Sequence, residues 1–166
     1  MKRTFAIALL VGALAAPAPA GATPVPQSVP SRLAARHVEV SADPLETASS
    51  GCRRVDVARV GRSVLGFVVY KFHQVKRWCW DFPRITYKRV YAYVIDVDPY
   101  MHYGGVVSRV GYFYRWCCSN PYSGHYSLRV AKFQNCVPWI GCIRTEYPWV
   151  KIWARAGGSY AYATGA

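Results

Sequence analysis

Residues 84–97 read RITYKRVYAYVIDV and carry the clearest structural signal in the chain. Val90, Ala92 and Val94 alternate with larger or charged residues. A period of two is typical of a β-strand, in which successive side chains point to opposite faces of the sheet. Valine, isoleucine and tyrosine also favour strands. We therefore predict a strand here, with a small apolar face directed toward a core.

Five further stretches share this composition and period, and we predict strands at 53–60, 66–78, 105–117, 125–133 and 148–156. Turn residues separate them, among them Pro83, the Asp98-Pro99 pair and the Gly157-Gly158 pair. No stretch combines a helical period with capping residues. Short, regularly spaced strands predict an all-β fold, either an antiparallel β-sandwich or, alternatively, a small barrel.

The N-terminus has the pattern of an export signal. Lys2 and Arg3 precede an apolar run over 5–16, which is too short to span a bilayer. Small residues follow, and we expect cleavage after Ala22, so residues 1–22 are a predicted signal peptide; a retained membrane anchor is the alternative. The protein is therefore expected to be secreted and extracellular.

Residues 23–50 contain four prolines and no cysteine or aromatic residue. A segment that cannot bury apolar area does not offset its ordering entropy. We expect a disordered Pro-rich linker or a propeptide, with a brief helix at 33–38. Residues 51–166 are then one disulfide-bridged all-β domain, since this length suits a single domain.

All cysteines fall in the predicted domain: Cys52, Cys79, Cys117, Cys118, Cys136 and Cys142. In an exported chain they indicate disulfides. Cys136 and Cys142 flank a turn-like segment, which favours a local bridge. Adjacent cysteines in a strand point to opposite faces, so Cys117 and Cys118 are expected to take different partners, with Cys52 and Cys79 as the natural ones. A Cys117–Cys118 ring is the alternative. We expect no metal and no cofactor, because no Cys-x-x-Cys pair is present.

The chain is strongly basic, with a formal net charge of +13. Two predicted strands place aromatic and basic side chains on the face opposite their aliphatic residues. We predict that these two stripes bind a ligand: Tyr87, Arg89, Tyr91, Tyr93, Trp149, Lys151, Trp153 and Arg155. Aromatic rings can stack on sugars while cations contact phosphate or carboxylate. Ordinary sheet packing is the competing interpretation, because aromatic cross-strand pairs also stabilise sheets.

Catalytic patterns are sparse. Asp96 and Asp98 share one strand face and His102 follows, which suggests an acid–base or divalent-cation site. A capped, solvated turn explains the same residues, since Asp-Pro commonly opens a turn. We assign no catalytic residue, and we expect a binding protein more than an enzyme.

Short motifs add a resemblance. WCWD at 78–81, IT at 85–86, YPW at 147–149 and GGS at 157–159 resemble small exported proteins of unknown function from actinobacteria. The resemblance covers most of 51–159 and implies secretion and an all-β domain, but no activity. It also implies counterparts of Cys52, Cys79, Cys136 and Cys142, which favours the Cys117–Cys118 ring if those four pair among themselves.

The sequence therefore predicts a secreted basic domain that binds an anionic cell-envelope polymer or an acidic glycan. One alternative is a bacteriocin-like or membrane-active antagonist, whose partner is an anionic membrane surface. Others are a secreted hydrolase and a protease inhibitor. No specific nucleic-acid partner is expected.

Overall fold

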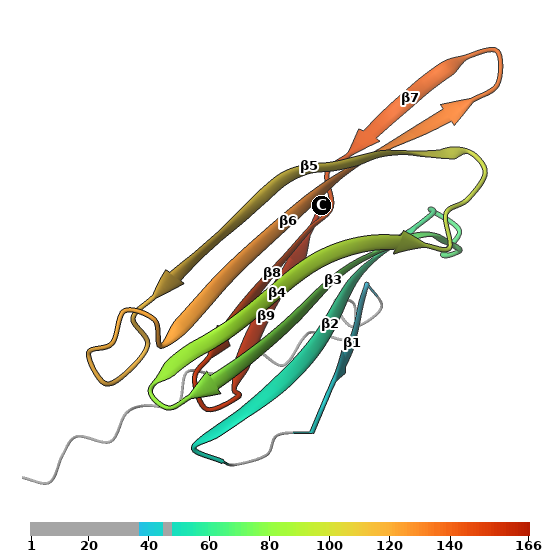
Figure 1. The fold of residues 1–166 in the computed structure, drawn as a ribbon. Coiled ribbons are helices and arrows are strands. Elements are labelled where there is room, and N and C mark those ends of the chain that lie inside the picture. Colours follow the sequence, from blue (N-terminus) through green and yellow to red (C-terminus); the bar gives the residue numbers. More distant parts are fainter. Residues whose placement is uncertain (1–36, 45–47) are drawn as a thin grey trace, which may run out of the picture.

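The structure is a computed structural model that describes residues 37–44 and 48–166 (Figure 1). The predicted signal peptide, most of the predicted linker and residues 33–36 of the predicted brief helix lie outside the described residues. The end of that predicted helix is wrong, because Val38 begins a strand. The described chain folds into nine strands: β1 (Val38–Ala42), β2 (Ser50–Arg62), β3 (Val68–Asp81), β4 (Arg84–Ile95), β5 (Met101–Tyr114), β6 (Gly124–Val137), β7 (Gly141–Glu146), β8 (Trp149–Arg155) and β9 (Tyr160–Gly165).

The strands form two antiparallel sheets that pack face to face (Figure 1). The first sheet has the order β1-β2-β3-β4, and consecutive strands are neighbours. The second has the order β5-β6-β8-β9, and β7 extends one end of β6 as a hairpin. The sheets do not close into one another, so the fold is a β-sandwich and the alternative of a small barrel does not apply.

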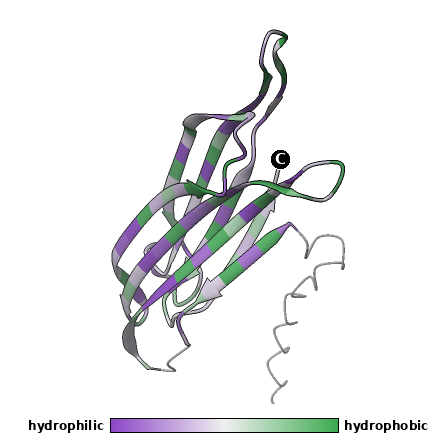
Figure 2. Cartoon of the chain, turned by 90° about the vertical axis from the view of Figure 1, so that its right-hand side faces the viewer, coloured by the Kyte–Doolittle hydropathy of each residue, from purple (hydrophilic) through white to green (hydrophobic). Residues whose placement is uncertain are grey.

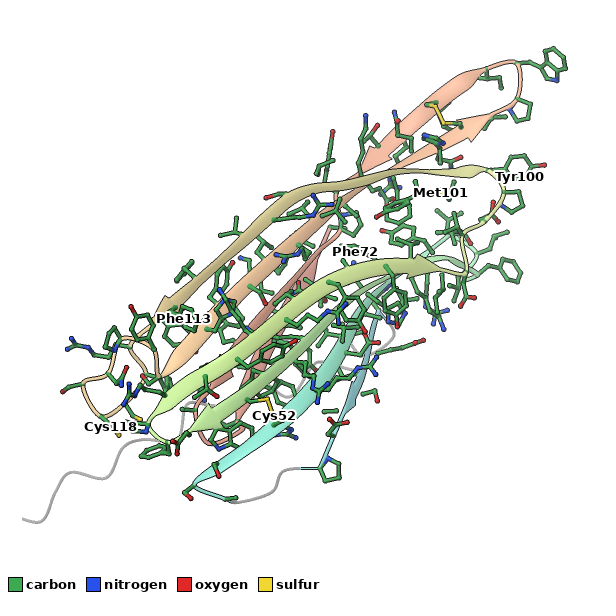
Figure 3. The ribbon with its side chains drawn as sticks, viewed as in Figure 1. Cys52, Phe72, Tyr100, Met101, Phe113 and Cys118 are labelled. Atoms are coloured by element: carbon green, nitrogen blue, oxygen red, sulfur yellow. A yellow bond between two sulfur atoms is a disulfide. The ribbon has the colours of Figure 1, made fainter. Side chains whose placement is uncertain are left out.

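The core lies between the two sheets and follows from the period of two along each strand. The first sheet contributes Val55, Val57, Phe72 and Trp78, which are fully buried. Facing residues of the second sheet include Phe133 and Ile152, with Val150 and Ala154 beside them. Figure 2 shows the resulting alternation of polar and apolar residues along the strands, and Figure 3 shows Phe72 between the sheets. The outer faces carry most of the exposed strand residues, although His73 and Val75 of β3 are buried there too, so a site on these faces is formed by their exposed positions.

The six predicted strands are all present, and β1, β7 and β9 are additional. The strand β1 falls within 23–50, the range expected to be a disordered linker. Val38 and Val40 alternate there with polar residues, but five residues without an aromatic side chain give a weak signal. Pairing with β2 supplies the stability that the segment lacks alone. The strand β9 is rich in alanine and glycine and is likewise ordered by its neighbour, β8.

Two disulfides are present, Cys52–Cys79 and Cys136–Cys142. Each joins residues directly opposite on neighbouring strands. The predicted local bridge at Cys136 is confirmed, but the expected pairing of Cys52 and Cys79 with Cys117 and Cys118 is wrong. The register of β2 against β3 places Cys52 and Cys79 side by side, whereas Cys117 and Cys118 lie in the β5–β6 loop as free thiols. Disulfides are typical of oxidising, extracellular compartments.

Candidate functional site

The two predicted ligand stripes lie on opposite sides of the sandwich. On β4, Ala92 and Val94 pack against the core, so Tyr87, Arg89, Tyr91 and Tyr93 lie on the outer face of the first sheet. On β8, Val150, Ile152 and Ala154 are in the core, so Trp149, Lys151, Trp153 and Arg155 lie on the outer face of the second sheet. The structure therefore does not bring the stripes together, and each has to be considered as a separate surface.

The first outer face carries a row of three arginines. Arg54 on β2 lies directly opposite Arg77 on β3, which lies directly opposite Arg89 on β4. All three are exposed. Neighbours in such a row have Cβ atoms about 5 Å apart, and like charges placed this way destabilise a sheet. None of the ion pairs within the described residues involves these arginines. The row is thus a concentrated positive charge, which Asp56 offsets in part at Arg54.

Exposed tyrosines border the arginine row on β4. Tyr87 and Tyr91 lie on either side of Arg89 and remain 46 % and 40 % exposed. The Arg54 Nη2 group donates to the Tyr91 hydroxyl at 3.4 Å, and the Arg89 guanidinium carbon lies 5.8 Å from the centre of the Tyr91 ring. A flat ring held between two cations is suited to stacking on a sugar whose acidic groups contact the arginines.

Beyond Tyr91, a hydrogen-bonded cluster fixes the rest of this face. The Asp56 carboxylate accepts from His73 Nδ1 at 2.9 Å and from the Tyr93 hydroxyl at 2.7 Å. The rings of His73 and Tyr93 stack with centroids 4.5 Å apart. Burial opposes ionisation of Asp56, but these hydrogen bonds outweigh it and lower its pKa. Burial and the bond to Asp56 raise the pKa of Tyr93 to about 12, so Tyr93 is a fixed structural member of the face and stays neutral.

Aromatic residues on the second outer face form a ladder across three strands. Tyr112, Tyr126 and Trp153 lie in consecutive contact, with ring centroids 4.8 and 5.4 Å apart. The Lys151 ammonium lies 4.5 Å from the centre of the Trp149 ring, and the Arg155 guanidinium carbon lies 3.4 Å from that of Trp116. The cations of this stripe are therefore engaged with rings of the same protein.

The aromatic rings of the second outer face also pack against the protein's own backbone. A Cβ atom on Gly165 would come within 2.5 Å of the Trp149 ring, so this indole lies flat on the glycine backbone. Trp149 and Trp153 are both only partly exposed. Aromatic residues that cover a glycine in this way stabilise a sheet. Of the predicted stripe residues, Tyr87 and Tyr91 are more exposed than Trp149 and Trp153, and the arginine row forms no ion pair among the described residues. The first outer face is consequently the better candidate for ligand binding.

The residues of the suggested acid–base site are used in local structure. The Asp98 Oδ1 atom accepts the backbone N–H of Tyr100 at 2.9 Å, as in a capped turn. Asp96 forms an ion pair with Lys71 at 3.3 Å. His102 is exposed at the start of β5. Within residues 37–44 and 48–166, no group of three or more His, Cys, Asp or Glu side chains could hold a metal ion.

Arg54 and Arg77 were not among the predicted site residues. Each alternates with buried positions on its own strand, a pattern typical of any solvated face. Their importance depends on the register that aligns them with Arg89, and no local sequence signal contains that register.

Comparison of the chain with family models, curated proteins and solved structures found no match. Among the described residues, no helix is long and apolar enough to cross a membrane.

Proposed function

We propose that this protein acts outside the cytoplasm and binds an anionic cell-envelope polymer or an acidic glycan through the outer face of the β1–β4 sheet. The observation that carries the proposal is the row formed by Arg54, Arg77 and Arg89, which lie directly opposite one another and form no ion pair among the described residues. An anionic ligand would relieve the repulsion that the row creates.

The chemistry of the row selects carboxylate or phosphate groups. A guanidinium binds such a group through two parallel N–H donors, which a lysine ammonium does not. Strands lie about 4.8 Å apart, so the row repeats with that spacing across the sheet. A chain with closely spaced acidic groups can therefore contact several arginines at once. Tyr87 and Tyr91 add flat surfaces beside the row for sugar rings.

The test is binding of the purified protein to two anionic probes, polygalacturonate and a poly(glycerol phosphate) teichoic acid, with dextran as the neutral probe. Arg77→Gln removes the central charge and is expected to weaken binding roughly tenfold or more, since a hydrogen bond to a charged group contributes about 1.5–3 kcal/mol. Arg115→Gln is the matched control, because Arg115 is an exposed arginine in the β5–β6 loop.

Measurements at low and high salt separate a defined site from net charge alone. Equal losses in Arg77→Gln and Arg115→Gln, together with complete loss of binding at high salt, would mean that the overall charge is responsible. That result would reject the proposal. A selective loss in Arg77→Gln, with residual binding at high salt, would support it.

A second candidate function, action on membranes, is favoured by the loops at one end of the sandwich. Trp139 at the tip of the β6–β7 hairpin and Val64 in the β2–β3 loop are 103 % and 99 % exposed, and Ile140 and Leu65 beside them are exposed too. Figure 1 shows the hairpin projecting beyond the body of the sandwich. Tryptophan is enriched at membrane–water interfaces, so these side chains suit insertion into a lipid surface.

Hydrogen bonds hold these loops at the same end. The Tyr100 carbonyl of the β4–β5 loop accepts from Cys136 N at 2.8 Å, and Asp98 N donates to the Val69 carbonyl at 2.9 Å. Residues of all three connections line a cavity of about 560 Å³. Dye leakage from phosphatidylglycerol vesicles tests this function. Trp139→Asn should abolish leakage while Arg77→Gln retains it, and intact vesicles with the unaltered protein would reject the idea.

A further inference from the structure

A separate group of basic side chains lies between the two sheets. Lys76 on β3 is fully buried, and its amino group donates to the His125 carbonyl at 2.5 Å and to the Ile152 carbonyl at 3.0 Å. Lys88 on β4 reaches the same region: its Nζ lies 3.0 Å from His125 Nε2 and 4.5 Å from the centre of the Phe113 ring. The imidazole of His125 is itself buried.

Two arginines extend this group toward the solvent. Arg129 on β6 shares the inner face with His125 and lies directly opposite Arg109 on β5. The strand β5 lies beyond the edge of the first sheet, because β4, the edge strand of that sheet, packs over β6, and β5 is the next strand and the edge of its own sheet. Arg109 and Lys88 are exposed, so the group opens to solvent along this edge.

Acidic side chains do not neutralise the group. None of the ion pairs in the described part of the chain includes Lys76, Lys88, Arg109 or Arg129. The charges that act on Lys76 are those of Lys88 and Arg129, and both are positive. The positive charges of Lys88, Arg109 and Arg129 lie close together at this edge without a counter-ion from the described chain, so they repel one another.

The group also has more donors than acceptors. After the hydrogen bonds within the described chain, two N–H groups of Lys88 and three of Arg129 have no protein acceptor, whereas the two N–H groups of a neutral Lys76 amine are both used by the His125 and Ile152 carbonyls. His125 accepts from Lys88 at Nε2, so its proton is on Nδ1, which is buried and has no partner. In this group the buried donor without an acceptor is His125 Nδ1–H, whereas the free N–H groups of Lys88 and Arg129 reach the solvent-facing edge, and free donors combined with positive charge indicate an anion.

We propose that the edge between β4 and β5–β6 binds a tetrahedral oxyanion, a phosphate or sulfate group, held by Lys88, Arg109 and Arg129 with Lys76 behind it. The group can be a free ion or a phosphoryl or sulfuryl group of a larger molecule. This site does not depend on the proposed function, since the arginine row lies on the outer face of the first sheet and the oxyanion site lies between the sheets.

The experiment is calorimetric titration of the full chain with inorganic phosphate, inorganic sulfate and glucose 6-phosphate, with sodium chloride at matched ionic strength as the control. Lys88→Gln and Arg109→Gln change exposed residues, so both variants should fold, which circular dichroism will check. Each is expected to weaken phosphate binding roughly tenfold, and Arg115→Gln, which changes an exposed loop arginine outside both proposed sites, should bind phosphate like the unaltered protein.

Comparing inorganic phosphate with glucose 6-phosphate distinguishes a site for a free ion from a site for a phosphoryl group. Binding of phosphate but not of glucose 6-phosphate supports a site for a free ion, and binding of both supports a site for a phosphoryl group. Phosphate should also change the NMR chemical shifts of the His125 ring, which a distant surface site would not affect. The proposal is overturned if neither anion binds more tightly than chloride, or if Lys88→Gln and Arg109→Gln bind phosphate as the unaltered protein does.

Discussion

Replacing Lys76 with methionine is expected to stabilise the protein. Methionine has a similar length and an apolar side chain, so it can occupy the space of Lys76 between the sheets. Burial lowers the pKa of Lys76 from its ordinary value of 10.5 to about 6, and the charges of Lys88 and Arg129 add to this effect. At pH 7 the folded protein therefore holds a neutral amine, whereas the unfolded chain holds an ammonium.

The size of the effect follows from that difference. Lys76 loses its proton when the chain folds at pH 7, and this lowers the free energy of unfolding by about 5 kcal/mol, because the ordinary pKa of lysine lies 3.5 units above pH 7. Methionine removes this cost, but it also removes the hydrogen bonds to the carbonyls of His125 and Ile152, which contribute about 1 kcal/mol each. The Ile152 carbonyl keeps the Ser127 hydroxyl as a donor. The His125 carbonyl loses its Lys76 donor, which costs about 1 kcal/mol more. The free energy of unfolding of Lys76→Met is therefore expected to exceed that of the unaltered protein by about 2 kcal/mol.

Urea unfolding of both proteins from pH 6 to pH 9 measures this prediction. Between pH 6 and the ordinary pKa of lysine, Lys76 is protonated in the unfolded chain but not in the folded protein. The free energy of unfolding of the protein with Lys76 therefore rises with pH. Relative to Lys76→Met, it should rise by about 1.4 kcal/mol per pH unit. The neighbouring groups Lys88, Arg109 and Arg129 are present in both proteins, and the pKa of His125 is lowered to about 3, mainly by burial, so it titrates below this range. Parallel curves for the two proteins would refute the reasoning.

Three smaller experiments test other contacts. Gly61→Ala should destabilise the protein by about 1–3 kcal/mol in urea unfolding, because its Cβ would come within 2.3 Å of the buried Tyr70 ring; unchanged stability would contradict that packing. Trp139→Asn should change stability by less than about 0.5 kcal/mol, since the side chain is fully exposed and asparagine tolerates the positive φ of 70°; a large loss would place the indole in a contact. Iodoacetamide should label Cys118 of the native protein faster than Cys117, because the hydrogen bond with Cys118 and burial raise the pKa of Cys117 to about 11; no labelling at all would indicate a bond between them.

Alternation along single strands was sufficient to predict much of the candidate site. Tyr87, Arg89 and Tyr91 were assigned to one face of their strand, and the structure places them on one outer face because the period of two is a local property of the backbone. The bridge between Cys136 and Cys142 was also predictable from local sequence, because only a short turn-like segment separates the two cysteines.

The residues of other strands that complete the arginine row and the Cys52–Cys79 bridge could not be predicted from the sequence. Arg54 and Arg77 join Arg89 only through the registers of β2, β3 and β4, and shifting one strand by a single residue would turn its side chains to the other face. Cys52 and Cys79 pair for the same reason, although the sequence favoured partners in another loop. The strand β1 was missed because its order comes from β2 rather than from its own residues.

By itself, the sequence determined that the chain forms strands, that the fold is all-β, and which side chains share a face within each strand. These properties depend on neighbours one or two residues away. Only the tertiary structure decided that the two aromatic stripes lie on opposite sides, that three arginines form one row, and that Lys76 meets His125 between the sheets. Strand order and sheet packing set those contacts, because they join residues that are far apart in the chain through hydrogen bonds and apolar burial.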